Sequence, residues 1–396
     1  MFLIIMPRKT TRNAQGSGTI RQRKDGTWEA RYTVGRDPGT GKQVQKSIYG
    51  KTQKEVRQRL QAIAVSLEEG TYMEPSKMLL CDWLETWVNE YCLGLKPGTI
   101  SLYRRYSRLY INPHLGHTKL SAITPPMIQS LYNRFTGGKD GSPKLETKTV
   151  KNIHGILHKA LAQAVEVGYM KQNPCDRCKP PRVERQEIKP LDTVKIGEFL
   201  NAIKGHPFET VYLVDLFTGM RQSEILGLTW DCINFEASTI RIYRQLQLID
   251  GQYQFGSLKN DKPRTIVPAA SVMTALREQK RQQLAMQLQA GEAWSNPDGF
   301  VFTDALGHHL ARQTVYKQYK KIVASIGMPD ARFHDLRHSY AVASLQAGDD
   351  VKTVQENLGH HTAAFTLDVY GHVTDQMRRK SAARMEDYIQ SIQAAK

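Results

Sequence analysis

Residues 218–224 read TGMRQSE, and the chain around them is best interpreted from this turn outward. A helix is predicted before it, over 209–218, and another from Ser223, so Arg221 lies in the turn that opens the second helix. At such a turn, backbone N–H groups and a guanidinium group can converge on one phosphate. The stretch therefore predicts a helical domain with an anion-binding turn.

Two segments further along the chain carry cationic side chains. Lys259 lies in a predicted β-turn, and Lys262 in the same turn is an alternative to it. Residues 334–338 read HDLRH, with His334 and Arg337 three positions apart. Side chains at this spacing are neighbours on a helix surface, so both are predicted to lie on one face.

The last segment is LGH at 358–360, followed ten residues later by Tyr370. Any one of these fragments occurs often by chance. Taken alone, Arg221, Arg337 or Tyr370 would more often be a structural residue than a catalytic one. All four segments in this order between residues 218 and 370 are not expected by chance. The ordered set, rather than any member of it, predicts a catalytic site.

The composition indicates a globular protein with a polyanionic partner. The chain has 396 residues, more than one compact core usually holds, so two or three domains are expected. Hydrophobic residues make up 40% and charged residues 23%, which excludes a wholly disordered or fibrous chain. The formal net charge of +17 favours nucleic acid as the partner, although a merely basic soluble protein remains an alternative on charge alone.

Metal and membrane sites are not predicted. The C-x-x-C of Cys175 and Cys178 lacks a second pair at zinc-finger spacing, and His154 and His158 lack the glutamate of a metalloprotease motif. Five cysteines without a regular framework favour a reducing compartment. No apolar run approaches the roughly 20 residues that span a bilayer. We therefore expect a soluble, intracellular protein.

The first 70 residues predict a small basic module. Strands are expected over 19–24, 27–34 and 43–49, and Thr52 is expected to cap a helix that follows them. This region holds 14 Lys or Arg against 6 Asp or Glu, nearly half of the whole charge excess. A sheet packed on one side by the helix leaves its basic side free, and strands can bind in the DNA major groove.

The DNA-binding candidates of this module are Arg21, Arg23, Trp28 and Arg31. Arg21 and Arg23 share a face of the first strand. In the second strand Trp28 lies on the apolar face, whereas Arg31 lies on the opposite face with Glu29. A solvated basic face without a partner is the alternative.

Residues 76–170 are predicted to be helical, with aromatic residues and arginines interleaved. Arg104 and Arg105 lie between Tyr103 and Tyr106 and are the DNA-binding candidates of this region. A nucleic-acid clamp would use both kinds of side chain, but aromatic residues at helical spacing are more often part of a core.

After a proline- and charge-rich stretch over 173–189, typical of a linker, the pattern becomes mixed. A single hairpin is expected inside a mostly helical domain, with strands over 239–249 and 252–258 and a further strand over 265–267. Helices are predicted over 193–203, 209–218, 271–289, 311–326, 335–347 and 351–358, and in the tail from Thr374.

The set R-x-S-E, hairpin Lys, H-x-L-R, L-G-H and late Tyr resembles the signature of the tyrosine recombinase (phage integrase) family. The resemblance covers about 185–385 and extends more loosely to the helical region before it. Lys259 lies five residues before Arg264, as in the hairpin of that family, which favours Lys259 over Lys262. The N-terminal motif R-K-D-G-x-W-x-A-R-Y-x-V-G is similar to the arm-site DNA-binding domain of integrases from Gram-positive conjugative transposons and related phages.

The resemblance implies a mainly α fold with small β elements, in three domains. These are an arm-site DNA-binding domain of a three-stranded sheet plus helix (1–72), a helical SAM-like core-binding domain (75–175), a linker (176–189), and a mixed, mostly helical catalytic domain with a C-terminal tail helix (190–396).

The resemblance also implies a site-specific DNA recombinase that integrates and excises a mobile element, such as a conjugative transposon or a prophage. Tyr370 would attack a DNA phosphodiester to give a 3′-phosphotyrosine and a free 5′-hydroxyl, and a partner strand would reverse the step without a cofactor or metal. Arg221 and Arg337 would bind the phosphate oxygens, and Lys259 would protonate the leaving oxygen.

The same resemblance assigns supporting roles. His334 would act as a base or proton relay, His360 would donate to a phosphate oxygen, and Glu224 would brace an arginine. Tyr340 and Tyr388 are rival nucleophiles, but neither lies at the family's spacing after the L-G-H motif.

The implied partners are double-stranded DNA with arm and core attachment sites and further copies of the chain in a homotetramer. An excisionase or a DNA-bending accessory protein would be a further partner, and the implied location is the bacterial cytoplasm at the nucleoid. Two alternatives stay open at this point: a catalytically inert DNA-binding regulator, and a type IB topoisomerase that relaxes supercoils. The arm-like module favours an integrase over both.

Overall fold

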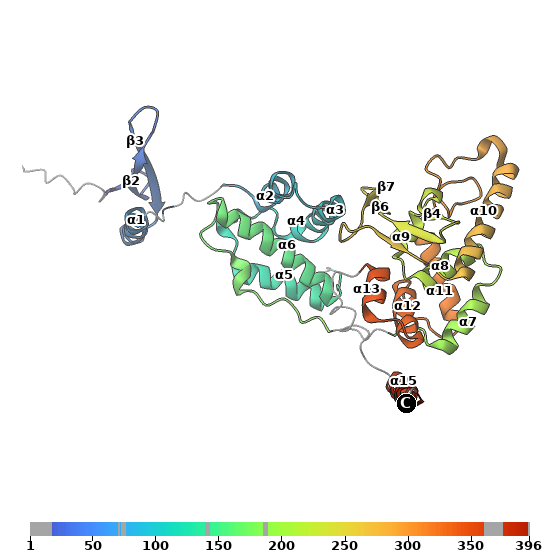
Figure 1. Cartoon of the computed structure of the whole chain (residues 1–396). Helices are drawn as coiled ribbons and strands as arrows, with labels where there is room; N and C mark the ends of the chain where they lie inside the picture. The colour runs from blue at the N-terminus through green and yellow to red at the C-terminus, as the bar shows by residue number, and fades with distance from the viewer. Residues whose placement is uncertain are drawn as a thin grey trace, which may run out of the picture. The chain divides into compact units, whose positions relative to one another are not determined.

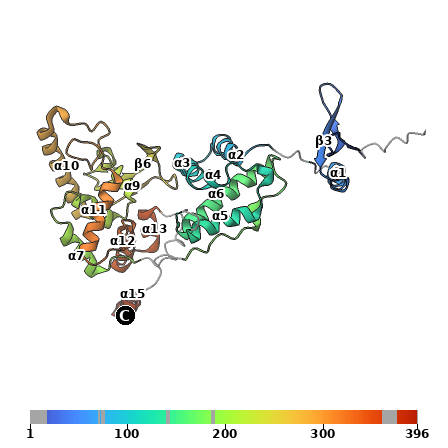
Figure 2. The same cartoon turned by 180° about the vertical axis from the view of Figure 1, so that it is seen from behind.

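The computed structural model describes residues 18–69, 72, 77–138, 143–184, 189–359 and 375–394. The chain divides into two compact units, 1–95 with 102–183 and 96–101 with 184–396. Within each unit the chain is mainly helical with small antiparallel sheets, as predicted (Figures 1 and 2). The domain bounds inferred from the sequence stay predictions. In the described part of the chain, no helix is long and apolar enough to cross a membrane.

The N-terminal module is a three-stranded antiparallel sheet with one helix. Its elements are β1 (Thr19–Gln22), β2 (Trp28–Arg36), β3 (Gln43–Gly50) and α1 (Gln53–Glu68). The strands pair in the order β1-β2-β3. The Thr52 hydroxyl caps α1 by accepting from the Glu55 backbone N–H at 3.2 Å, as the sequence predicts.

The side chains of β2 point alternately to the two faces of this sheet. Ala30 and Tyr32 are buried in a cluster with Val56 of α1, and Trp28 packs against the same cluster. Glu29, between Trp28 and Ala30, points to the other side because strand side chains alternate. One face of the sheet is therefore the core of the module, and the other carries its charged side chains.

The helical region follows. Its elements are α2 (Leu80–Thr86), a π-helical turn (Trp87–Tyr91), α3 (Pro97–Tyr106), a second π-helical turn (Ser107–Ile111), α4 (Asn112–Leu115), a 3-10 turn (Leu120–Ala122), α5 (Pro125–Gly137), α6 (Thr147–Glu166) and a 3-10 turn (Pro174–Arg177). Tyr103 and Tyr106 are buried, and Tyr103 stacks on Trp87 with ring centroids 5.2 Å apart. The prediction that these aromatic residues belong to a core is confirmed.

The cysteine pair of this region is buried, and the histidine pair bonds to neighbouring side chains. Cys175 and Cys178 are buried free thiols. His154 Nδ1 lies 2.9 Å from the hydroxyl of Tyr132. Among the described residues, no group of three or more His, Cys, Asp or Glu side chains is placed to hold a metal ion.

The stretch predicted to be a linker begins as ordered structure. The Gln129 side chain of α5 accepts from the Lys179 N–H at 2.8 Å and donates to the Lys179 carbonyl at 3.1 Å. These two bonds fix the backbone at Lys179 against α5. Proline and charge content did not indicate this packing, because the contact depends on a glutamine 50 residues away in the sequence.

The second unit holds the remaining elements. These are α7 (Thr193–Ile203), α8 (Glu209–Thr218), α9 (Gln222–Leu226), a 3-10 turn (Trp230–Cys232), β4 (Ile233–Asn234), β5 (Thr239–Ile242), β6 (Arg244–Ile249), β7 (Gln252–Ser257), β8 (Arg264–Ile266), α10 (Ala270–Ala290), a 3-10 turn (Gly291–Ala293), α11 (Arg312–Ser325), α12 (His334–Ala347), α13 (Val351–Leu358) and α15 (Asp375–Ala394). Helix α8 is central, because it contacts α7, α9, α10 and α12. Its residues Tyr212 and Val214 are fully buried in the main core.

The prediction of a single hairpin in this unit is wrong about its first strand. The strand expected over 239–249 is two strands: β5 pairs with β4 and β8 in one sheet, and β6 pairs with β7 in another. Ile240 and Ile242 of β5 are buried, but Arg244 does not continue that apolar face. Its guanidinium donates to the Thr229 hydroxyl at 2.8 Å instead. Strand β4 was missed because it is only two residues long.

Candidate active site

Arg221 is held at the start of α9 by Glu224. Helix α8 ends at Gly219, whose φ of +62° suits glycine, and a Cβ there would come within 2.4 Å of the Tyr340 ring. Arg221 Nη1 then donates to Glu224 Oε1 at 2.7 Å, and its backbone N–H donates to Oε2 at 2.9 Å. The prediction that Glu224 braces an arginine is confirmed.

A second arginine, Arg264 of β8, binds the same carboxylate. Its Nη2 donates to Glu224 Oε2 at 2.6 Å and its Nη1 to Oε1 at 3.2 Å. The motifs in the sequence do not assign Arg264 a role of its own. A signal was present, because period-two alternation puts Arg264 on the same side of its strand as the buried Ile266.

Arg337 of α12 is buried, with 1% of its surface exposed. Its Nη1 donates to the Gly219 carbonyl and its Nη2 to the Leu358 carbonyl, both at 2.6 Å. Arg337 therefore joins the end of α8 to the end of α13, and the Arg221 turn follows directly from the first of these ends.

The end of α13 gathers three guanidinium groups. Three consecutive carbonyls accept from them: Asn357 from Arg264 Nε at 2.7 Å, Leu358 from Arg337 Nη2 at 2.6 Å, and Gly359 from Arg221 Nη2 at 3.3 Å. The last carbonyls of a helix lack partners within the helix and form the negative end of its dipole, so they attract cations. The structure thus brings Arg221 and Arg337 together, as the sequence predicts, and adds Arg264.

His334 stands at the start of α12, with its ring 4.8 Å from that of His338 in an edge-on arrangement. Part of its surface is exposed, yet desolvation of the ring lowers its pKa well below the usual value, and His338, Arg337 and Arg221 lower it further. Desolvation also lowers the pKa of the buried His338 to about 4. Both imidazoles are therefore neutral at pH 7, and a neutral imidazole can accept a proton.

The turn that carries Lys259 contacts the end of α13. Asn260 Nδ2 donates to the Gly359 carbonyl at 3.3 Å, beside the Arg221 contact. Lys259 and Lys262 are both exposed, and within the described residues the Lys259 side chain makes no hydrogen bond or ion pair. The preference for Lys259 over Lys262 stays a prediction.

His360 and Tyr370 lie outside the described residues. The rival tyrosines lie within them. Tyr340 is half-buried, its ring packs on Gly219, and its hydroxyl accepts from Asn357 Nδ2 at 3.0 Å. Tyr388 is exposed on α15. The hydroxyl of Tyr340 is therefore already engaged within the fold.

Asp215 of α8 is a buried carboxyl group close to these arginines. Neither of its oxygens has a hydrogen-bond partner among the described residues. Burial raises the pKa of Asp215 well above its usual value, and the charge of Glu224 adds to this, whereas Arg337 opposes it. Burial therefore favours the protonated form of this carboxyl group, which motif spacing does not indicate.

In the N-terminal module, the candidate arginines surround Glu29. Arg21 Nε donates to Glu29 Oε2 at 2.8 Å, Arg31 Nε donates to Oε1 at 3.0 Å, and Ser47 Oγ donates to Oε1 at 2.9 Å. The hydrogen bonds from Arg31 and then Arg21 lower the pKa of Glu29 to about 2. The guanidinium groups themselves stay exposed.

Of the other DNA-binding candidates, Arg23 shares the face of Glu29 and the rest do not. Arg23 stands 5.4 Å over the ring of Tyr49, a neighbour of Glu29 on the same face of the sheet, whereas Trp28 packs toward the helix. Arg104 and Arg105 of α3 are exposed. The structure therefore gathers Arg21, Arg23 and Arg31 on one face and leaves Trp28 on the other.

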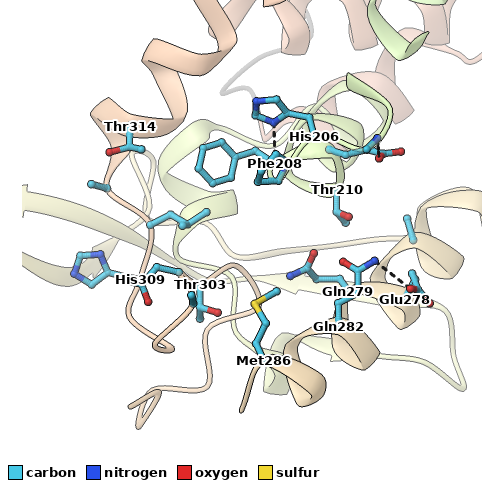
Figure 3. A pocket seen from close by; sticks show the side chains of 18 residues that line it. His206, Phe208, Thr210, Glu278, Gln279, Gln282, Met286, Thr303, His309 and Thr314 are labelled. Carbon is cyan, nitrogen blue, oxygen red and sulfur yellow. Dashed lines mark hydrogen bonds between the residues drawn. The ribbon is translucent and has the colours of Figure 1, made fainter. Parts of the chain in front are cut away.

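A separate cavity of about 790 Å³ lies in the second unit (Figure 3). It is lined by residues 205–210 before and at the start of α8, by α10, and by residues 303–314. The side chains of Gln279 and Gln282 come to it from α10 (Figure 3). None of its lining residues is a candidate catalytic residue, so this cavity is not the predicted site.

The sequence matches two family profiles. The Phage integrase family matches residues 192–377, and the Phage integrase, N-terminal SAM-like domain matches residues 79–136. A tyrosine recombinase XerC-like protein of Caldanaerobacter subterraneus is 31% identical over 376 residues, which are 90% of this chain and 94% of that protein. The chain belongs to the phage integrase family. The resemblance inferred from the motifs is confirmed.

Members of the phage integrase family also match along most of the chain. The ICEBs1 integrase of Bacillus subtilis is 23% identical over 94% of this chain and all of that protein. The Tn1549 transposon integrase, solved with transposon right end DNA, has a TM-score of 0.65 at 21% identity over 78% of this chain and all of that one. A lambda integrase dimer on a core site has a TM-score of 0.55 at 18% identity over 89% of this chain and 95% of that one. At these identities the two structures show a shared fold.

Family membership settles the class of activity. This phage integrase family chain is an enzyme, a site-specific DNA recombinase of the integrase type. The two alternatives, an inert DNA-binding regulator and a type IB topoisomerase, are set aside.

Proposed function

We propose that this chain cuts and rejoins DNA by transesterification with Tyr370 as the nucleophile. The Tyr370 oxygen attacks the phosphorus of a phosphodiester while its proton passes to a base. A bond forms between that oxygen and the 3′-phosphate, the bond to the 5′-oxygen breaks, and the 5′-oxygen takes a proton from an acid. The 5′-hydroxyl of a partner strand then reverses the step, so phosphodiester bonds are conserved.

The convergence of Arg221 and Arg337 on the end of α13 carries this proposal. Their carbonyl partners, Gly359 and Leu358, directly precede His360 in the sequence. Charge that builds up on the phosphate in the transition state is stabilised by fixed guanidinium donors. The Arg221 side chain is 18% exposed, so it meets the phosphate first, and Arg337 acts from beneath it.

His334 and Lys259 are proposed as the proton carriers. The lowered pKa of His334 keeps its imidazole neutral, so it accepts the proton of Tyr370. Lys259 is exposed, on a turn bonded to the end of α13 through Asn260, and donates to the 5′-oxygen. Lys262 is the alternative donor, which Lys259→Ala and Lys262→Ala would separate. His360 is proposed to donate to a phosphate oxygen.

The deciding experiment traps the covalent adduct. Incubation of the full-length protein with DNA from the two ends of the mobile element, followed by mapping of the protein-linked 3′ ends, defines the core duplex. Tyr370→Phe is expected to bind that duplex in a gel shift and to form no adduct. Tyr169→Phe, a half-exposed tyrosine packed edge-on against Trp83, is the matched control and should form adduct normally. An undiminished adduct from Tyr370→Phe would overturn the proposal.

The N-terminal module is proposed to bind arm sites while the helical region and the catalytic domain bind the core site, within the predicted bounds 1–72, 75–175 and 190–396. The arginine face around Glu29 supports this role for the module. Two binding modules on one chain raise the effective concentration of the second site. Deletion of residues 1–72 should leave cleavage of the core duplex intact and impair recombination of full attachment sites. Equal recombination by the truncated chain would refute the arm role.

A homotetramer on DNA is proposed as the active assembly. The tail helix α15 supports it, because exposed apolar side chains recur at i, i+3, i+4 and i+7 along one face: Met385, Tyr388, Ile389 and Ile392. Such a face fits a neighbouring copy of the chain. An excisionase or DNA-bending protein is proposed as a further partner that sets the direction of recombination.

A further inference from the structure

Arg264 joins three segments that each carry or adjoin a proposed catalytic residue. It is the first residue of β8, which follows the Lys259 turn and pairs Arg264 with Ile242 of β5. Its two Nη atoms bind Glu224, which holds Arg221. Its Nε donates to the Asn357 carbonyl at the end of α13. Only the planar fork of an arginine offers donors in these directions at once.

We propose that Arg264 is a positioning residue for strand cleavage, which fixes the Arg221 turn, the Lys259 turn and the end of α13 as one unit. This inference rests on the proposed catalytic role of Arg221. Arg264 itself is not proposed to touch DNA, because its side chain is only 9% exposed.

Charge gives Arg264 a second effect on Arg221. The Glu224 side chain is fully buried, and its carboxylate lies between two guanidinium groups. With Arg264 present, the three groups sum to one positive charge. Without it, Glu224 and Arg221 would neutralise each other, and the field that Arg221 presents to a phosphate would fall.

The close approach of Gly359 confirms how tightly the Arg264 guanidinium is confined. A Cβ at residue 359 would come within 3.0 Å of Arg264 Nη1, and the φ of Gly359 is +64°. A side chain at position 359 would therefore press on the guanidinium group and strain the backbone, both of which glycine avoids. Contacts with the surrounding residues therefore fix the conformation of the Arg264 side chain.

The test measures single-turnover formation of the covalent adduct on the mapped core duplex with the full-length protein. Arg264→Gln should lower the cleavage rate about 100-fold, since a misplacement of about 1 Å has an effect of that size. The half-saturating DNA concentration should stay the same. Arg264→Lys should recover only part of the rate, because an ammonium group keeps the charge and loses the fork. Arg281→Gln, which removes an arginine from an exposed pair with Glu278, is the matched control and should not slow cleavage.

The pH profile separates positioning from general damage. Burial raises the pKa of Glu224, but Arg264 and then Arg221 overcome it and hold this pKa at about 2. The other titratable group coupled to this carboxyl is Asp215 of α8, whose own pKa is raised by burial. In Arg264→Gln the Glu224 pKa should rise, so the acid limb of the cleavage profile should move to higher pH. A loss of folded protein alone would lower the rate without moving that limb.

A double variant tests whether Arg264 acts through Glu224. If Arg264 acts through Glu224, then Glu224→Gln/Arg264→Gln should cleave about as slowly as Glu224→Gln alone. Losses that multiply, or an acid limb that stays in place, would overturn the inference. So would wild-type rates for both Arg264 variants while Arg221→Ala is inactive. Wild-type cleavage by Arg221→Ala would instead overturn the proposed function itself.

Discussion

The N-terminal module and the catalytic unit each contain a buried glutamate between two arginines. Glu29 binds Arg21 and Arg31, whose side chains are 59% and 49% exposed. Glu224 binds Arg221 and Arg264, which are 18% and 9% exposed. In both places the pKa of the glutamate is lowered to about 2.

The difference in exposure separates binding from catalysis. Around Glu29 the carboxylate binds Arg21 through Nε and Nη2 and Arg31 through Nε, yet about half of each arginine side chain stays exposed, where DNA phosphates can reach it. Around Glu224 the same arrangement is enclosed, and helix carbonyls take further donors. The exposed arginines around Glu29 can contact phosphates at several positions on the surface. The enclosed arginines around Glu224 hold their positive charge at one fixed position.

The largest expected effect comes from breaking the enclosed arrangement. Glu224→Gln leaves two buried guanidinium groups without their counter-charge, which should lower the free energy of unfolding by about 3–5 kcal/mol. Urea denaturation at pH 7 would measure it. Glu29→Gln serves as the comparison and should lose much less, because its arginines are solvated. Equal losses would show that exposure does not distinguish the two sites.

The next largest effect is expected at Asp215, where a substitution should raise rather than lower the free energy of unfolding. Its folded pKa is raised, so its contribution to stability is present below its usual pKa near 3.9 and lost as the pH rises. Asp215→Asn should therefore raise the free energy of unfolding at pH 7, by on the order of 1–3 kcal/mol. The gain should vanish near pH 3. A gain that does not depend on pH would show that charge burial is not its cause.

The salt dependence of DNA binding tests whether the exposed arginines around Glu29 contact phosphates and the enclosed Arg264 does not. Arg31→Ala should reduce the slope of log K against log salt by about 0.9 on a mixed-sequence duplex, because one phosphate contact is lost. Arg264→Gln should leave this slope unchanged, since its guanidinium is enclosed. Titrations by fluorescence anisotropy between low and physiological salt would measure both. A slope change of similar size in the two variants would contradict the assignment.

The smallest expected effect is a change of selectivity. Glu29→Gln removes a negative charge beneath Arg21 and Arg31 and frees both to move. Binding to mixed-sequence DNA should then rise severalfold, while the preference for attachment-site DNA over that competitor falls. A competition assay would report the ratio. If the preference rose instead, the carboxylate would not be orienting the two arginines.

Local sequence signals predicted much of the fold. The bounds of α7, α8 and α13 follow from capping residues and apolar periodicity, and the strands of the N-terminal module follow from alternation and turn residues. The split of residues 239–249 into two strands was not predicted, because it is defined by pairing: β5 pairs with β4 and β8, and β6 pairs with β7. Partners far apart in sequence leave no local pattern.

The candidate site shows the same limit. The ordered motifs identified Arg221, His334 and Arg337, and the structure places the two arginines on neighbouring carbonyls. Motif spacing did not reveal that Arg264 shares Glu224, nor that Arg337 is almost fully buried. Both facts depend on three-dimensional packing around the end of α13. Spacing alone likewise did not reveal the lone carboxyl of Asp215.

The last turn of α13 sets a limit on how this chain can diverge. One residue added or removed between Val351 and Gly359 would turn the end of the helix by about 100°. Three guanidinium groups would then lose their carbonyl partners in a single mutational step. At the tip of the β6–β7 hairpin, Asp250 accepts from Ser101 Oγ at 2.8 Å, a contact that involves no proposed catalytic residue. In sequences that diverge from this chain, we expect insertions and deletions at that hairpin and not within α13.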